Sequence, residues 1–240
     1  MPSVAVPAAH LSYLATPNAS SDATPVVFVH GFCQSSGFWS PTLDLLPTSH
    51  RGFALDLTGF GSSRASKSID DRVNEPTYSM EELADHVVTF ADALSLDRFV
   101  LCGNSMGGVV CQALATRHPG RLLKLVLVAT GAFPGDPAAG LEKADMMEAM
   151  PWERAFFETS VQAFFAEGNA PADWDSVLVP IAMGAVREAM VGATRSSAQH
   201  NFLLADRDIA CPTLIVQGEL DTSRTPVDGG RLNGAIAGSE

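Results

Sequence analysis

Short apolar runs alternate with amphipathic stretches along the first half of the chain. Runs bounded by turn residues are typical of buried strands, and they predict strands at 10–15, 25–29, 52–56, 98–102, 122–129 and, later, 213–217. Apolar residues at helical spacing predict helices at 79–94 and 106–117. Ser79 and Glu82 have the spacing of a capping box that opens the first of these helices. Such alternation predicts an α/β fold, with a mostly parallel sheet flanked by helices.

The pattern changes after residue 130. Residues 131–205 carry methionines and aromatic side chains in helix-like stretches and give no strong strand signal, so we interpret them as a helical cap insertion over the sheet. Ordinary connecting helices are the alternative interpretation. Residues 1–130 are then the first part of a core domain, and residues 206–240 are its second part, with a glycine-weakened helix at about 227–237.

Composition narrows the class of protein. Of the 240 residues, 46% are hydrophobic and 18% are charged, which is typical of a globular protein with a large core. The net charge of -12 makes nucleic acid and membrane surfaces poor partners. The four cysteines are scattered without metal-ligand spacing, and no membrane-length apolar run or secretory signal is recognisable. We therefore expect a cytoplasmic location.

The segment Gly103-Asn104-Ser105-Met106-Gly107 lies directly between a predicted strand and a predicted helix. It matches the G-x-S-x-G pattern of a nucleophile elbow, a sharp turn that holds a serine hydroxyl above the sheet. Side chains at 103 and 107 would crowd this turn, and glycine relieves the crowding. The turn leaves the Met106 amide unpaired at a helix N-terminus, where it can stabilise an oxyanion. We predict that Ser105 is a nucleophile; a glycine-rich turn with a capping serine is the alternative.

Four segments together resemble the α/β-hydrolase superfamily over nearly the whole chain. They are His30-Gly31-Phe32-Cys33, the loop 56–63, the Ser105 turn and Gly218-Glu219-Leu220-Asp221. The resemblance implies that the Phe32 amide shares the oxyanion with Met106, and that His30 supports its loop without a catalytic role. It also implies that Asp221 is the acid that orients a catalytic histidine, with Glu219 as the alternative acid.

The histidines depart from the family pattern. Catalytic residues of these enzymes follow the order serine, acid, histidine, but no histidine follows Asp221. The six histidines are His10, His30, His50, His86, His118 and His200. We expect His86 and His118 to face solvent, and we retain His200 as the remaining candidate base. Ser239-Glu240 resembles the start of a further strand, so we expect a C-terminal truncation.

The resemblance implies acyl transfer by a serine hydrolase, through an acyl-enzyme and without a metal or organic cofactor. Aromatic and methionine side chains of the cap suggest an apolar pocket for a small-molecule substrate such as an ester, lactone or thioester. The Ser105 segment also resembles hydrolases that cleave carbon–carbon bonds of ring-fission products, so this subclass stays open. A non-catalytic ligand-binding protein on the same scaffold is the alternative that the missing histidine favours.

Overall fold

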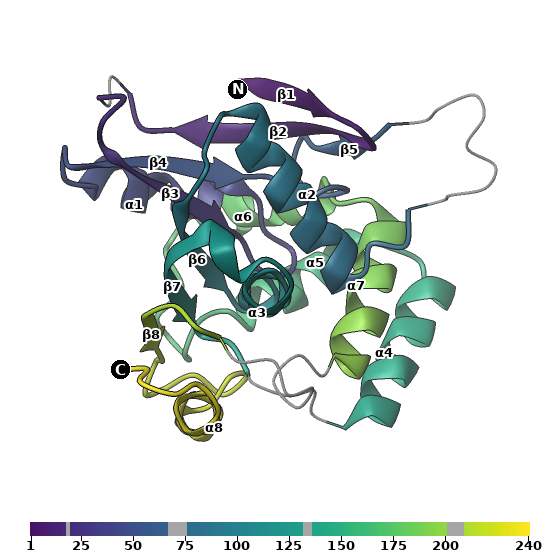
Figure 1. Cartoon of the computed structure of the whole chain (residues 1–240). Helices are drawn as coiled ribbons and strands as arrows, with labels where there is room; N and C mark the ends of the chain where they lie inside the picture. Colours follow the sequence, from purple (N-terminus) through teal and green to yellow (C-terminus); the bar gives the residue numbers. More distant parts are fainter. Residues whose placement is uncertain (18–19, 67–75, 132–135, 201–208) are drawn as a thin grey trace.

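A mostly parallel sheet forms the centre of the molecule in the computed structural model, which describes residues 1–240 except 18–19, 67–75, 132–135 and 201–208 (Figure 1). In spatial order its strands are β1 (Ser3–Val6), β2 (Ala9–Ala15), β4 (His50–Leu55), β3 (Thr24–Val29), β6 (Phe99–Asn104), β7 (Leu122–Val128) and β8 (Thr213–Val216); β5 (Arg64–Ala65) pairs with β2. All six predicted strands are present within one or two residues of their expected bounds.

The pairing of β3 with β4 and β6, of β6 with β7 and of β7 with β8 is parallel, which confirms the predicted sheet. Among the described residues, the antiparallel pairs lie at one edge, where β1, β4 and β5 each pair with β2. Sequence patterning did not predict β1 or β5. Because parallel strands end at the same edge of a sheet, the loops after β3, β6, β7 and β8 converge there.

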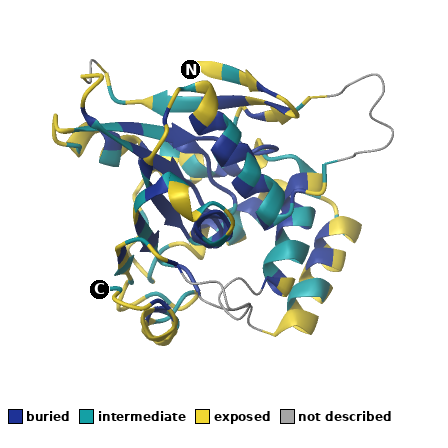
Figure 2. Ribbon diagram, in the orientation of Figure 1, coloured by how far each residue is buried: buried dark blue, intermediate teal, exposed yellow. Residues whose placement is uncertain are grey.

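The central strands are buried on both faces, as their unbroken apolar runs predict. On β3, Val27 and Val29 belong to the large core that includes residues of helices α2 (Met80–Ala93) and α3 (Met106–Arg117). The alternate residues Val26 and Phe28 face a smaller core that includes Leu43 of α1 (Ser40–Leu45). Figure 2 shows this buried centre between the helices. Each fully buried side chain of this kind stabilises the fold by about 1.5–3 kcal/mol.

Helix α2 begins at the predicted cap, but only half of the capping box forms. The Ser79 hydroxyl accepts a hydrogen bond from the Glu82 amide at 3.1 Å, as expected. The Glu82 carboxylate instead accepts from the amides of Thr77 and Tyr78, both at 2.8 Å. The reciprocal contact is lost because Glu82 holds the segment before the helix rather than the cap residue itself.

Between β7 and β8 the structure describes the helices α4 (Pro137–Ala149), α5 (Arg154–Gln162), α6 (Trp174–Met183) and α7 (Arg187–Gln199). No strand occurs among the described residues of this stretch, in agreement with the helical interpretation, although the predicted domain bounds stay a prediction. Helices α4 and α7 lie side by side (Figure 1), and α5 packs on α6. Across the described ranges, no single helix is long and apolar enough to cross a bilayer; only α6 and α7 combined reach that length, and they are bent by 88°.

The last strand, β8, forms the far edge of the sheet and is followed by α8 (Pro226–Ala235). Leu214 and Val216 of this strand are 46% and 45% exposed. The backbone of Glu240 lies alongside: its amide donates to the Thr213 carbonyl at 3.1 Å, and its carbonyl accepts from the Ile215 amide at 2.8 Å. These two bonds have the pattern of a parallel strand pair.

Candidate active site

Ser105 lies at the sharp turn between β6 and α3, with φ 49° and ψ −115°. This positive φ is unfavourable for a residue with a side chain, and it persists because the turn is fixed from both sides. The Ser105 amide donates to the Val128 carbonyl at 2.9 Å, and the Ser105 carbonyl accepts from the Thr130 hydroxyl at 2.7 Å. The strained turn is the backbone geometry that the sequence motif predicts.

The glycines of the turn are required by close packing. A Cβ at Gly107 would lie 2.4 Å from the carbonyl oxygens of both Val29 and His30. A Cβ at Gly103 would lie 2.5 Å from the Gly107 carbonyl oxygen and from the Cys111 sulfur. The crowding inferred from the sequence is therefore present, and its source at Gly107 is the end of β3.

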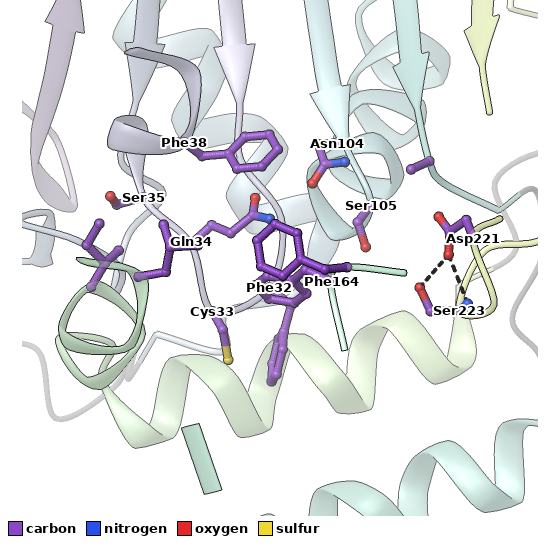
Figure 3. A pocket seen from close by; sticks show the side chains of 14 residues that line it. Phe32, Cys33, Gln34, Ser35, Phe38, Asn104, Ser105, Phe164, Asp221 and Ser223 are labelled. Atoms are coloured by element: carbon purple, nitrogen blue, oxygen red, sulfur yellow. Dashed lines mark hydrogen bonds between the residues drawn. The ribbon is translucent and has the colours of Figure 1, made fainter. Parts of the chain in front are cut away.

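Ser105 borders two cavities, one of about 140 Å³ and one of about 450 Å³. No hydrogen bond engages its hydroxyl within the described part of the chain. Apolar side chains line much of the smaller cavity, among them Phe38, Phe164, Phe165, Leu178 and Ile181; Figure 3 labels Phe38 and Phe164 of this set. Phe32, Phe164 and Ser223 border both cavities, so the two spaces meet at Ser105.

The loop after β3 brings Phe32 beside Ser105. The Gln34 side-chain oxygen accepts from the Gly31 amide at 2.7 Å, which fixes the turn. The amides of Phe32 and Met106 donate no hydrogen bond to any of the residues that the structure describes, and both residues line the larger cavity with Ser105. Two uncommitted N–H groups beside a serine hydroxyl are the arrangement that an oxyanion requires.

Asp221 lines the smaller cavity together with Ser105 (Figure 3). Its Oδ1 accepts from the Ser223 amide and hydroxyl, both at 2.9 Å, and from the Arg224 amide at 2.8 Å. Its Oδ2 has no donor among the described residues. Glu219, the alternative acid, is exposed and lines neither cavity. The carboxylate is thus held by its own turn, with one oxygen left to accept a further hydrogen bond.

None of the six histidines of the chain lines a cavity that contains Ser105. His30 is buried; its Nε2 accepts from the Leu57 amide at 3.1 Å and its Nδ1 lies 2.8 Å from the Gly31 carbonyl, consistent with a loop-supporting role. Burial lowers the pKa of His30, so the ring is neutral. His200 is buried at the end of α7 and borders a separate cavity.

The expectation that His86 faces solvent is wrong. The side chain is buried, and its Nδ1 lies 2.9 Å from the Thr58 hydroxyl. The loop that carries Thr58 covers His86 on the inner face of α2. The sequence did not reveal this burial because the contact joins residues 28 positions apart. His118 is partly exposed and pairs with Asp85 at 3.0 Å.

Sequence reasoning named the loop 56–63 but gave no role to Asp56, a buried carboxylate that follows β4 directly. It accepts from the Ser36 amide at 2.6 Å and from the Ser62 amide at 2.8 Å, and so ties two loops of the site edge together. An aspartate directly after a buried strand was the available signal. Cys33 borders the smaller cavity, but burial raises its pKa to about 12 and keeps it a thiol. Among the described residues no His, Cys, Asp or Glu side chains cluster as metal ligands.

The sequence of the chain is similar to a family model and to curated relatives. A family model described as alpha/beta hydrolase fold matches residues 24–171. The 1-acylglycerol-3-phosphate O-acyltransferase ABHD5 of Rattus norvegicus is 33% identical over 139 residues, 56% of this chain and 36% of the relative. The (Lyso)-N-acylphosphatidylethanolamine lipase of Bos taurus is 32% identical over 117 residues, 49% of this chain and 33% of the relative. The match spans only about a third of each relative.

Solved structures share the fold over the whole chain. The enol-lactonase from Burkholderia xenovorans LB400 has a TM-score of 0.86 and 23% identity, covering 100% of this chain and 89% of its own. A thermophilic esterase from Thermogutta terrifontis (malate bound) has a TM-score of 0.82 and 24% identity, covering 100% and 88%.

Proposed function

The chain belongs to the alpha/beta hydrolase fold family, and on this premise we propose that it is a serine hydrolase that acts on a small ester, lactone or similar carbonyl compound. Ser105 is the proposed nucleophile, and the acyl group is transferred to its hydroxyl before water releases it. The names of the two curated relatives, an acyltransferase and a lipase, favour acyl chemistry.

One observation carries the proposal: the strained Ser105 turn lies where two cavities meet, with the amides of Phe32 and Met106 at one cavity and the carboxylate of Asp221 at the other. The Ser105 hydroxyl would attack the substrate carbonyl, and the amides of Phe32 and Met106 would stabilise the oxyanion that forms. Loss of one oxyanion donor typically costs a factor of about 10²–10³ in turnover, so these amides contribute substantially to the rate.

The proton of Ser105 needs an acceptor, and Asp221, whose Oδ2 has no donor among the described residues, would hold an imidazole there. A carboxylate in this position orients the ring and stabilises its charged form. Because no histidine of the described residues borders the cavity, Ser105 keeps a proton and is a weak nucleophile at neutral pH. The 240-residue chain should therefore hydrolyse activated esters slowly, and added imidazole should accelerate it.

The test is release of 4-nitrophenol from 4-nitrophenyl butyrate by the chain and by Ser105→Ala, each with and without imidazole. The Ser105→Ala protein serves as the blank, because imidazole alone also cleaves activated esters. We expect a Ser105-dependent rate that imidazole raises by about tenfold or more, and that Asp221→Asn reduces. Equal rates for the chain and for Ser105→Ala under all conditions would contradict the proposal.

The second candidate function is ligand binding without catalysis, and the absence of a histidine from the described lining of both cavities favours it. The same experiment separates the two. Binding of an ester without Ser105-dependent release, with or without imidazole, would support the binding protein.

A further inference from the structure

The larger cavity beside Ser105 differs in chemistry from the smaller one. Residues of α4 and α7 form one wall, and the turn after β8 forms another. Lys143 and Arg224 both line it, whereas no lysine or arginine of the described residues lines the smaller cavity. A cavity lined largely by apolar side chains and a cavity with two cations thus both border Ser105.

Lys143 extends from α4 toward the proposed oxyanion site. Its Nζ lies 5.7 Å from the centroid of the Phe32 ring, and Phe32 borders both cavities. A cation held over an aromatic face keeps its remaining donors available for an anion. The side chain makes no ion pair or hydrogen bond with any described residue.

Arg224 follows the turn that holds Asp221. Its backbone makes two hydrogen bonds among the described residues: the amide donates to Asp221 Oδ1 at 2.8 Å, and the carbonyl accepts from Gln217. No described carboxylate pairs with its guanidinium. By contrast, five arginines elsewhere are in ion pairs: Arg117, Arg121, Arg154, Arg195 and Arg231. Among the described residues, the cations that make no ion pair also include Arg51, Arg64, Arg98, Arg187 and Lys124. Lys143 and Arg224 differ from these in that both line a cavity that Ser105 borders.

The rest of the wall suits an anion as well. Ser197 lines the cavity, and its hydroxyl makes no hydrogen bond to the described residues. Asp136 also lines the cavity, but its Oδ1 caps α4 by accepting from the Ala138 amide at 2.9 Å. Its charge is thereby partly balanced by the positive end of the helix dipole.

We propose that the substrate carries an anionic group, a carboxylate or phosphate, which Lys143 and Arg224 bind in the larger cavity while its apolar chain fills the smaller one. This inference rests on the proposed function, because it places the scissile carbonyl at Ser105 between the two ends. Binding of both ends of the substrate would hold its carbonyl in a fixed orientation toward the Ser105 hydroxyl. An overall charge of -12 repels anions, so recognition depends on these two local cations.

Binding is measured on Ser105→Ala protein, so that the outcome does not depend on catalysis. Calorimetric titration compares monomethyl adipate, an anion, with neutral dimethyl adipate, and monobutyl phosphate distinguishes phosphate from carboxylate. The same titrations are made after Lys143→Met and Arg224→Met. Lys124→Met is the matched control, because Lys124 is an exposed cation of β7 that lines neither cavity. Lys143→Arg retains the charge, and a melting curve of each variant verifies folding.

We expect at least one anion to bind more tightly than the neutral diester, and each Met variant to weaken it about threefold to tenfold. Lys124→Met and Lys143→Arg should leave its Kd within about twofold, and added salt should weaken binding. Equal Kd values for charged and neutral ligands would overturn the proposal, as would losses of the same size in the Lys124→Met control. Tight anion binding by a chain without Ser105-dependent hydrolysis would uphold this inference while the proposed catalysis fails.

Discussion

Replacement of Gly107 by alanine tests whether the end of β3 and the start of α3 are packed as closely as the structure shows. The new Cβ would lie 2.4 Å from two backbone oxygens, those of Val29 and His30. An ordinary carbon–oxygen contact is about 3.3 Å, so the two elements must separate by roughly 0.9 Å. Backbone atoms paired in a central sheet cannot yield as a side chain can.

The size of the effect follows from two opposing contributions. Overpacking of this kind costs about 3 kcal/mol, whereas the helix preference of alanine over glycine offsets about 1 kcal/mol. We expect Gly107→Ala to lower the free energy of unfolding by about 2 kcal/mol, and to reduce Ser105-dependent ester hydrolysis because the Phe32 loop follows β3 directly. The matched control is Gly230→Ala in α8, where the added Cβ meets nothing within 4 Å. This control should gain about 0.5–1 kcal/mol.

Urea unfolding followed by the fluorescence of the 3 tryptophans measures both variants. With a slope of about 2 kcal/mol/M, the midpoint should fall by about 1 M for Gly107→Ala and rise slightly for Gly230→Ala. A Gly107→Ala protein as stable as the Gly230→Ala protein would refute the close-packing argument.

Three further outcomes are expected. Burial lowers the pKa of His30 and His86 below 6.5, so these two side chains take up protons at a higher pH in the unfolded state than in the folded state. The free energy of unfolding should therefore decline as the pH falls below that value. Urea midpoints at about pH 7.5 and about pH 5.5 measure this decline, and a His86→Gln variant with an unchanged decline would contradict its cause. Asp56→Ala removes the acceptor of two amides and should cost about 3 kcal/mol by urea unfolding, with Asp56→Asn costing less; equal costs would contradict the role of the carboxylate. Phe164→Ala opens the wall shared by both cavities and should raise the imidazole-assisted hydrolysis of long-chain relative to short-chain 4-nitrophenyl esters, and an unchanged ratio would place the acyl chain elsewhere.

The elements whose backbone geometry is specified by neighbouring residues could be predicted from the sequence. The strand at 25–29 and the turn around Ser105 were predictable because an unbroken apolar run and a glycine-flanked serine each specify one backbone geometry. The edge strand β1 was not, since Ser3–Val6 is only 4 residues long and is held by its pairing with β2.

Residues that come together only in the fold were harder to predict. Lys143 and Arg224 lie 81 positions apart in the sequence (224 − 143). No sequence motif connects a cap helix with the turn after β8. His86 was misjudged for the same reason, because its burial depends on the distant Thr58 loop. The catalytic roles of Ser105, Asp221, Phe32 and Met106 stay predictions, although the structure brings all four residues to the two cavities.

The most direct test of the central claim is to find where an acyl group becomes attached. The chain is mixed with 4-nitrophenyl butyrate and imidazole, quenched in acid, digested and mapped by mass spectrometry. We predict a butyryl ester on Ser105, which Ser105→Ala abolishes. Ser223 borders the same two cavities and is the internal comparison. An acyl group on Ser223, or none on Ser105 while the ester is consumed above the rate of the Ser105→Ala blank, would contradict the assignment of Ser105 as the nucleophile.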